Sequence, residues 1–211
     1  MDDALGLLEA RWPDPSPELH ARAAWERLVG GILAAGTSAE RANQALAVLS
    51  EHLVGVPAYA RLALPDLEAA LSRFPSGRVK ARAISEAARA VLRRHRGAVP
   101  ADEVALRALP GVDAAVAAGV LADAFGRPAV ADDAGLRRVV LRLGWCGTEP
   151  RAARQAVMDR LPETVWTRRS RQLTLLSRAC CRPLRPRCGD CPLAATCLRQ
   201  GVDGWRRHAT P

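Results

Sequence analysis

The stretch LPGVDAAVAAGVLADAFG, residues 109–126, predicts a tight turn followed by a long apolar helix. The turn consists of Leu109, Pro110, Gly111 and Val112. Glycine at position 111 lets the backbone turn sharply and approach a phosphate closely. The helix after the turn would point free N–H groups and the positive end of its dipole at such an anion. The stretch is therefore a candidate phosphate clamp, although a turn of this kind can also be purely structural.

The residues after the turn depart from what a phosphate clamp is expected to carry. Asp113 can cap the helix that begins there, so its carboxylate would compete with a phosphate for the same N–H groups and repel it. Ala115 offers neither a positive charge nor a nucleophile. Lys80 is the one lysine among 31 basic residues, and arginine does not replace an amine as a nucleophile. We interpret Lys80, within the basic stretch 78–95, as a solvated or phosphate-facing charge rather than a relocated nucleophile.

The overall charge indicates a polyanionic partner. The chain of 211 residues carries a formal net charge of +9, which favours nucleic acid, although a generally basic proteome would give the same excess. A run of about 20 apolar residues, which a membrane span needs, is absent, and the sequence begins with an acidic segment rather than a signal peptide. We therefore expect a cytoplasmic protein, associated with the nucleoid, that does not bind membranes.

Helical periodicity dominates the sequence, and no convincing alternating strand is present. This periodicity predicts a series of helices with short connections, and therefore an all-α chain. Asp66 is the predicted N-cap of one helix, and Pro100 with Asp102 opens another. The predicted helices are a short one that starts at residues 5–8 and ends before WPDPSP at 12–17, and the segments 18–35, 39–53, 66–73, 78–95, 102–109, 113–125, 133–142, 150–160 and 163–178.

Five of the six cysteines lie between residues 180 and 197, which indicates metal binding rather than disulfides in a cytosolic chain. Four of them form the pattern C-x6-C-x2-C-x5-C, namely Cys181, Cys188, Cys191 and Cys197. Such an all-thiolate set suits either zinc or an iron–sulfur cluster, and the spacing leaves both open. Cys180 is a neighbour that the pattern does not need, and Cys146 is assigned to packing.

The turn and the cysteine pattern together resemble the endonuclease III branch of the helix–hairpin–helix DNA glycosylases. The similarity covers nearly the whole chain and includes LHARAAWERLVGGILAAGTS, VPADEVALRALPGV, AFGRPAVADDAGLRRV and RPRCGDC. It implies that the four cysteines of the pattern hold a 4Fe–4S cluster rather than zinc. It also implies a monomer that binds double-stranded DNA with damaged or abasic sites in base excision repair.

The resemblance implies two helical domains that flank a DNA cleft. One is a six-helix barrel over residues 20–128, with the helix–hairpin–helix at about 101–125. The other is a helical cluster domain of residues 1–19 and 129–211, with the 4Fe–4S loop at 181–197.

Carried over to this chain, the active site of the family keeps one catalytic group and loses another. Bifunctional members use a lysine in the first turn of the second hairpin helix, which attacks the sugar and forms a Schiff base. The matching position here is Ala115. The catalytic aspartate matches Asp133, whose carboxylate would stabilise the developing positive charge on the sugar and position a water. Asp133 can equally be a helix N-cap, and Asp132 is an adjacent spare.

The loops that the family uses to hold DNA open also differ. The loop that fills the space of a flipped base usually carries a glutamine, where this chain has Gly36, and the opposing wedge matches Ser76. Extruding a base costs a few kcal/mol, which inserted side chains help to offset, and these two residues would offset little. Ala39 stands where a polar loop residue is common, and Gly135 replaces a histidine.

Two functions therefore remain open at the level of sequence. The first is a DNA glycosylase, a hydrolase that removes a base by Asp133-assisted water attack and has no Schiff-base lyase step. The second is a catalytically inactive 4Fe–4S protein of the same fold that binds duplex DNA.

Overall fold

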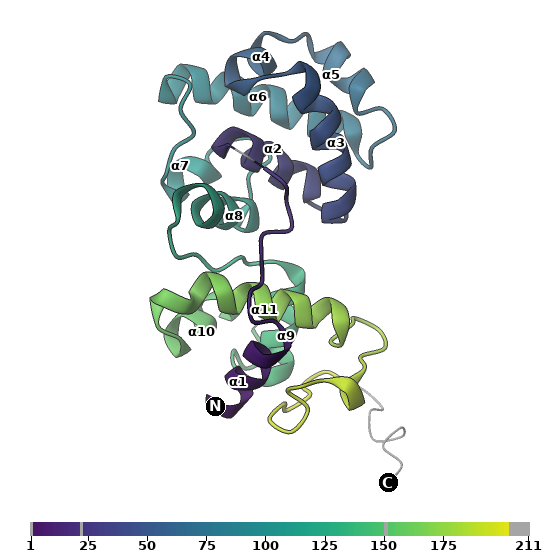
Figure 1. Cartoon of the computed structure of the whole chain (residues 1–211), viewed down its shortest axis with the longest axis vertical. Helices are drawn as coiled ribbons and strands as arrows, with labels where there is room; N and C mark the ends of the chain where they lie inside the picture. Colours follow the sequence, from purple (N-terminus) through teal and green to yellow (C-terminus); the bar gives the residue numbers. More distant parts are fainter. Residues whose placement is uncertain (1, 22, 150–151, 203–211) are drawn as a thin grey trace. The chain divides into compact units, whose positions relative to one another are not determined.

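The computed structural model describes residues 2–21, 23–149 and 152–202, and within these ranges it contains helices and no strands. The all-α class predicted from the sequence is therefore confirmed. The chain divides into two compact units (Figure 1). We call Pro17–Arg127 the hairpin unit, and Met1–Ser16 together with Pro128–Pro211 the cysteine unit.

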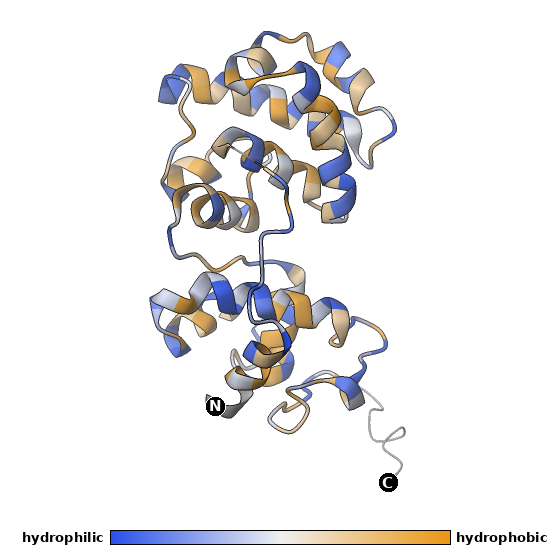
Figure 2. Ribbon diagram, in the orientation of Figure 1, coloured by the Kyte–Doolittle hydropathy of each residue, from blue (hydrophilic) through white to orange (hydrophobic). Residues whose placement is uncertain are grey.

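The hairpin unit has its core where apolar helix sides pack together (Figure 2). Helix α2 contacts α3, α6 and α8, because its apolar residues recur at helical spacing and are buried. Its helices are α2 (Ala24–Ala34), α3 (Ala39–His52), α4 (Gly55–Arg61), α5 (Leu64–Ala70), α6 (Gly77–His95), α7 (Glu103–Arg107) and α8 (Ala114–Phe125). The fully buried core residues include Leu28, Val29, Leu33, Ile84, Val91, Leu106 and Val120. Each such side chain contributes about 1.5–3 kcal/mol through burial.

One ion pair lies inside this apolar core. The guanidinium of Arg27 on α2 is 3.2 Å from the carboxylate of Asp123 on α8, and both side chains are 8% exposed. Burial lowers the pKa of Arg27. Removing either partner would leave an uncompensated buried charge, which costs about 3–5 kcal/mol. The pair therefore fixes the helix that follows the hairpin turn against α2.

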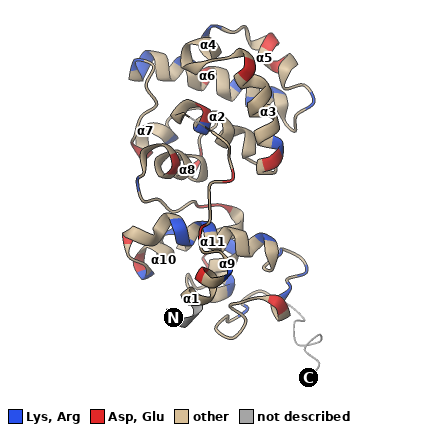
Figure 3. Cartoon of the chain, viewed as in Figure 1, with Lys and Arg blue, Asp and Glu red and all other residues tan. Residues whose placement is uncertain are grey.

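Helix α6 spans 19 residues and carries arginines along its exposed side (Figure 3). Positions separated by three or four residues lie on one helix face. The exposed arginines of this face are Arg78, Arg82, Arg89, Arg93 and the C-capping Arg96, and Glu86 lies among them. Across the described ranges, no helix combines the length and the apolar character that a membrane crossing requires.

The cysteine unit joins the first helix of the chain to the last ones. Its helices are α1 (Asp2–Arg11), α9 (Ala134–Leu143), α10 (Ala153–Arg160) and α11 (Trp166–Ala179), with short 3-10 turns η2 (Glu163–Val165) and η3 (Cys188–Asp190). Their apolar sides form one core that includes Leu8, Leu136, Val140, Val157, Leu173 and Leu176. Residue Leu8 of α1 is thus part of a core built otherwise from residues beyond position 129.

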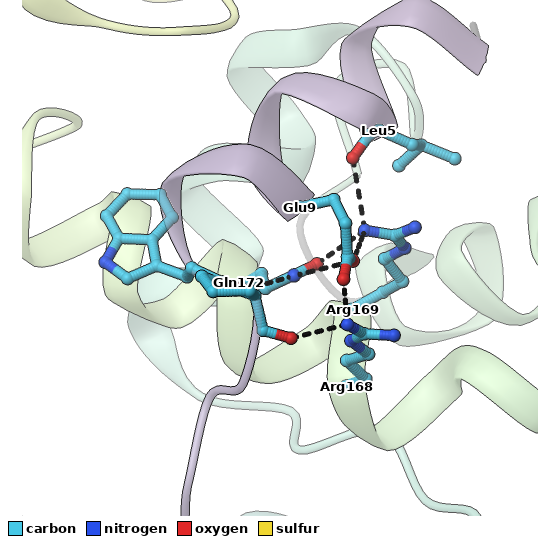
Figure 4. Close-up of polar contacts among 7 residues, drawn as sticks. Leu5, Glu9, Arg168, Arg169 and Gln172 are labelled. Atoms are coloured by element: carbon cyan, nitrogen blue, oxygen red, sulfur yellow. Dashed lines mark hydrogen bonds and ion pairs between the residues drawn. The ribbon is translucent and has the colours of Figure 1, made fainter.

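Polar contacts also hold α1 on α11 (Figure 4). The carboxylate of Glu9 pairs with Arg168 and lies 2.9 Å from Nη1 of Arg169. The amide of Gln172, which is fully buried, donates to Glu9 at 3.2 Å and to the carbonyl of Trp12 at 2.7 Å. Because a buried amide without partners is costly, these contacts specify where α1 packs.

The structure corrects several predicted helix boundaries. Helix α5 begins at Leu64, so Asp66 lies in its first turn and Ala63 occupies the N-cap; Pro65, near the start, fits the first turn because its missing N–H needs no partner there. Helix α4 was not predicted, since GVPAYAR contains glycine and proline. Helix α2 begins at Ala24 rather than at 18, and the segment 163–178 starts with a 3-10 turn. Positions 150 and 151 of the predicted helix 150–160 lie outside the described residues.

Candidate nucleic-acid interface and metal centre

The hairpin turn connects α7 to α8 in a fixed conformation. The N–H of Val112 donates to the carbonyl of Leu109 at 3.2 Å, and both of these side chains are buried. Gly111 has a φ of +76°, and a Cβ built there would lie 2.8 Å from that of Ala83 on α6. Only glycine meets both conditions without strain. The turn therefore packs closely on α6 while the backbone of Gly111 itself stays exposed.

Asp113 is the N-cap of α8, as the sequence predicts. Its Oδ1 accepts a hydrogen bond of 2.8 Å from the N–H of Val116, and the residue is exposed. The carboxylate thus satisfies one of the N–H groups that a helix start leaves without an intrahelical partner. Ala115 lies half-buried in the same first turn and presents only a methyl group.

Lys80 lies inside the hairpin unit, so its interpretation as a solvated or phosphate-facing charge is wrong. Its side chain is buried, and Nζ donates to the carbonyls of Leu33 at 2.6 Å and Ala35 at 2.8 Å. Nζ also lies 4.8 Å from the ring centroid of Phe74. Burial lowers the pKa of Lys80. These carbonyls belong to the end of α2, where helix carbonyls lack intrahelical partners. The ammonium of Lys80 donates the hydrogen bonds that they would otherwise lack.

Lys80 contacts both loops that hold the predicted DNA-opening positions, Gly36 and Ser76. Gly36 follows Ala35 with a φ of +70° and is exposed. Ser76 is the exposed N-cap of α6 with a φ of 56°, and its carbonyl accepts from the N–H of Lys80 at 3.0 Å. Ala39 is the first residue of α3. Both loops therefore have a defined backbone, but neither Gly36 nor Ser76 supplies a long side chain.

Asp133 is the N-cap of α9 and has a second, tertiary contact. Its Oδ1 accepts from the N–H of Leu136 at 2.8 Å, and its Oδ2 accepts from the hydroxyl of Thr174 on α11 at 2.9 Å. Gly135 permits this close packing, because a Cβ built there would lie 2.3 Å from Oγ of Ser177. The cap interpretation is confirmed, and catalysis by Asp133 stays a prediction.

Asp132 has a different role from its neighbour. Both of its oxygens bind Arg137, with distances of 2.7 Å to Nε and 2.7 Å to Nη2. A bidentate pair of this kind fixes the carboxylate in one orientation. Asp132 is therefore committed to a local ion pair rather than held as a spare carboxylate.

The cysteines of the sequence pattern line one cavity of the cysteine unit. The cavity is lined by Cys181, Cys188, Cys191 and Cys197, together with Cys180, Arg142 and other residues. Burial, with smaller contributions from nearby cysteine sulfurs, raises the pKa of Cys191 to about 11. The same cause raises the pKa of Cys197. None of the six cysteines, all of which lie within the described residues, forms a disulfide.

Two arginines of α9, which the sequence pattern did not single out, hold the first part of the cysteine loop. The buried Arg142 donates to Sγ of Cys181 at 3.3 Å, to the carbonyl of Arg182 at 2.7 Å and to that of Pro183 at 2.8 Å. Arg138 donates to the carbonyl of Cys181 at 2.8 Å. The only sequence signal for these contacts is the presence of arginines on a helix that is otherwise apolar on one side.

The donor chemistry of this cavity fits a thiophilic metal group. Five thiols and the side chains of Arg142 and Arg199 line it, so the negative charge of thiolates bound to a metal would be partly offset. Within the described ranges, no three His, Cys, Asp or Glu side chains already converge as ligands of a single ion.

A basic groove adjoins the hairpin turn. It has a volume of about 310 Å³ and is lined by Glu86, Arg89, Ala90, Arg93, Arg94, Ala108 and Pro110. Pro110 belongs to the turn, and the three arginines are exposed residues of α6. The turn and the arginine face of α6 thus form one continuous surface within the hairpin unit.

This combination of a hairpin turn and a cysteine-lined cavity is typical of helical DNA-repair proteins, and comparison with known proteins agrees. The sequence model of the HhH-GPD superfamily base excision DNA repair proteins matches residues 29–163. Since that range covers more than half of the 211 residues, the protein belongs to this superfamily.

Endonucleases III are among its relatives. The chain is 31% identical to endonuclease III of Treponema pallidum, over 92% of this chain and 93% of that protein. It is 30% identical to endonuclease III of Escherichia coli K12, over 95% and 96%. A trapped endonuclease III–DNA covalent intermediate superimposes with a TM-score of 0.88 and 29% identity, covering 93% of each chain. A non-covalent endonuclease III–DNA complex gives 0.87.

Proposed function

We propose that the protein binds damaged or abasic double-stranded DNA and removes a base by water attack assisted by Asp133, without a Schiff-base step. The DNA complexes of its structural relatives support the choice of partner. The observation that carries the proposal is the pair Asp133 and Ala115. A carboxylate is fixed at the start of α9 by two hydrogen bonds, while the first turn of α8 offers no amine.

In the proposed reaction, the N-glycosidic bond breaks and its electron pair leaves with the base. The positive charge that develops on the sugar is stabilised by the carboxylate of Asp133. The oxygen of a water then bonds to C1′, and its proton passes through Asp133 to the released base. Because Leu136 and Thr174 each hold one oxygen of Asp133, the carboxylate is oriented before the substrate binds.

A lyase step would need a primary amine that can attack C1′. Ala115 has none, and the ammonium of Lys80 is bound to two carbonyls in the interior of the hairpin unit. We therefore expect no adduct with abasic-site DNA after borohydride treatment. An adduct that persists in Lys80→Ala and after blocking of the terminal amine would contradict the proposal.

Contacts to the DNA backbone are assigned to the hairpin turn and to the groove beside it. The exposed backbone at Gly111 and the start of α8 offer N–H groups, while Asp113 reduces their attraction for a phosphate. Arg89, Arg93 and Arg94 provide positive charge next to Pro110. Arginines that bind phosphates release counterions, so affinity falls as salt rises.

Salt dependence tests this backbone surface. The double variant Arg93→Ala/Arg94→Ala should reduce the slope of log K against log salt by about 1.8, at about 0.9 for each phosphate contact. The control Arg41→Ala/Arg61→Ala removes two exposed arginines of the same unit that lie outside the groove. Equal slopes for the two double variants would show that only net charge matters.

The four cysteines of the pattern are proposed to hold a 4Fe–4S cluster. The choice of a cluster over zinc rests on the relation to endonuclease III, because the thiols themselves suit both. When bound, the group would tie the loop 181–197 into one structure and supply a redox-active centre. Arg142 would hold the sulfur of Cys181 and offset part of the negative charge. Iron and acid-labile sulfide in anaerobically purified protein would support the cluster. Stoichiometric zinc would instead reject the cluster assignment and identify a zinc site.

Base release from a panel of duplexes tests the activity. Each duplex carries one oxidised, alkylated, deaminated or mismatched base, and hot alkali converts base loss into strand breaks. Asp133→Asn should slow release by about 10²–10⁴-fold while it preserves folding, because asparagine caps helices as well as aspartate does. Asp132→Asn is the matched control, since it changes the neighbouring carboxylate that binds Arg137.

The second candidate is a DNA-binding protein without catalysis. Gly36 and Ser76 favour it, because neither can fill the space that a flipped base leaves. Tight binding with no base release across the whole panel would establish this function in place of the glycosylase.

A further inference from the structure

Five cysteines, and not only the four of the spacing pattern, line the cavity of the cysteine unit. The fifth is Cys180, which is 9% exposed and ends α11 as its C-cap. Its N–H and that of Cys181 both donate to the carbonyl of Leu176 at 2.9 Å. The two adjacent cysteines therefore leave the same helix end with a well-defined backbone, and both border the same cavity.

The sulfurs of these two cysteines have different partners. Sγ of Cys180 lies 3.5 Å from the carbonyl of Asp190, in the segment between Cys188 and Cys191. Sγ of Cys181 accepts from Nη1 of Arg142 at 3.3 Å. Cys180 is thus directed at the short chelate loop, while Cys181 is held on the side of α9.

A cysteine can also fill a core position simply as a small apolar residue. Cys180 does pack in the core of the unit. However, a purely packing role does not need a sulfur that borders a cavity lined by four other thiols. The position of Cys180 at this cavity is the observation that separates a ligand from a packing residue.

We propose that Cys180 is a reserve ligand of the metal centre that takes the place of Cys181 when that bond is lost. The proposal rests on the proposed metal binding by the four cysteines. In the exchange, the thiol of Cys180 releases its proton to water and its sulfur binds the metal at the vacated position. The thiolate of Cys181 leaves the metal and takes up a proton, so no electron is transferred.

Metal content after substitution tests the exchange. The wild type, Cys180→Ala, Cys181→Ala, Cys188→Ala and the double variant Cys180→Ala/Cys181→Ala are purified anaerobically. Iron, acid-labile sulfide and zinc per chain are measured together with the visible absorbance. Cys188→Ala is the matched control, because it removes a ligand of the pattern that has no adjacent cysteine.

We expect Cys180→Ala to keep the full metal content and Cys181→Ala to keep at least about half of it, since a thiolate still completes the set. Cys188→Ala and the double variant should fall below about a tenth, because each then has three thiolate ligands. The absorbance of Cys181→Ala should resemble that of the wild type. The same comparison applies to zinc if the wild type carries zinc.

Three outcomes with the variants would overturn the proposal. The first is a Cys181→Ala protein as depleted of metal as Cys188→Ala, or insoluble where Cys188→Ala is soluble. The second is metal retention by the double variant. The third is loss of metal from Cys180→Ala, which would make Cys180 a primary ligand. A wild type that binds neither metal would reject the metal centre itself, and with it this proposal.

Discussion

The starts of α8 and α9 are built alike and differ in what surrounds them. Each begins with an aspartate whose Oδ1 accepts from the N–H three residues later at 2.8 Å, in the sequences DAA and DAG. Asp113 is exposed, and its carboxylate accepts this local capping hydrogen bond from within α8. Asp133 is half-buried, and Thr174 on α11 binds its second oxygen. The same local motif thus gives a surface cap in one unit and an oriented carboxylate in the other.

This difference predicts that the two aspartates respond unequally to the same change. Asp133→Asn should lower the single-turnover rate of base release by about 10²–10⁴-fold, the usual contribution of a catalytic carboxylate. Asp113→Asn should leave that rate within about twofold, because its carboxylate has no role in the chemistry. The rates are measured with saturating protein on one duplex that the wild type processes. A similar loss in both variants would remove the functional distinction between the two caps.

The glycine after the second cap should be required by packing. In Gly135→Ala, the new Cβ would lie 2.3 Å from Oγ of Ser177 and 2.9 Å from Oδ1 of Asp133. Overpacking of this kind should lower the free energy of unfolding by about 1–3 kcal/mol. Gly119→Ala in α8 is the control, since nothing lies within 4 Å of its built Cβ, and it should raise that free energy by about 0.5–1 kcal/mol. Denaturant titration measures both; a tolerated Gly135→Ala would show that α9 and α11 can separate without cost.

Removal of each capping carboxylate should lower the free energy of unfolding by a different amount at the two helix starts. Asp113→Ala should lower the free energy of unfolding by about 1 kcal/mol, the usual effect of losing a cap. Asp133→Ala should cost about 1–3 kcal/mol more, because the hydroxyl of Thr174 also loses its acceptor. Thermal or denaturant unfolding distinguishes the two variants. Equal losses would mean that the contact with Thr174 contributes nothing measurable.

The smallest effect concerns the affinity for DNA at the hairpin turn. Asp113→Asn keeps a capping side chain but removes a negative charge from the helix start. The loss of this charge should make the free energy of DNA binding more favourable by about 0.3–1 kcal/mol, which is about two- to fivefold tighter binding. Asp102→Asn is the control, because Asp102 caps α7 with a similar hydrogen bond of 2.8 Å. Fluorescence anisotropy at low salt measures both. Unchanged affinity in Asp113→Asn would show that phosphates do not approach this helix start.

Local patterns predicted the parts of the fold that depend on neighbouring residues. Asp113 and Asp133 could be recognised as caps because their partners lie three residues away. The prediction of Asp66 as an N-cap was wrong because the helix begins two residues earlier, at Leu64, with Pro65 in its first turn. Lys80 could not be placed from sequence, since its carbonyl partners at Leu33 and Ala35 are 47 and 45 residues away.

In the candidate metal site, too, the sequence predicted the local pattern but not the contacts between distant residues. The regular spacing of four cysteines made the ligand set recognisable. The contact of Arg142 with Cys181 spans 39 residues and follows only from the packing of α9 beside the loop. The cavity position of Cys180 likewise required the folded loop, because the pattern alone assigned that residue no role.

The burial of Lys80 has a practical consequence for chemical labelling. It is the only lysine of the chain, and its ammonium is held by two carbonyls and covered by the ring of Phe74. Amine-reactive esters should therefore acylate the folded chain at its terminal amine and spare Lys80. Acylation of Lys80, read by peptide mass, would then report each opening of the junction between α2 and α6, and give a site-specific measure of local unfolding.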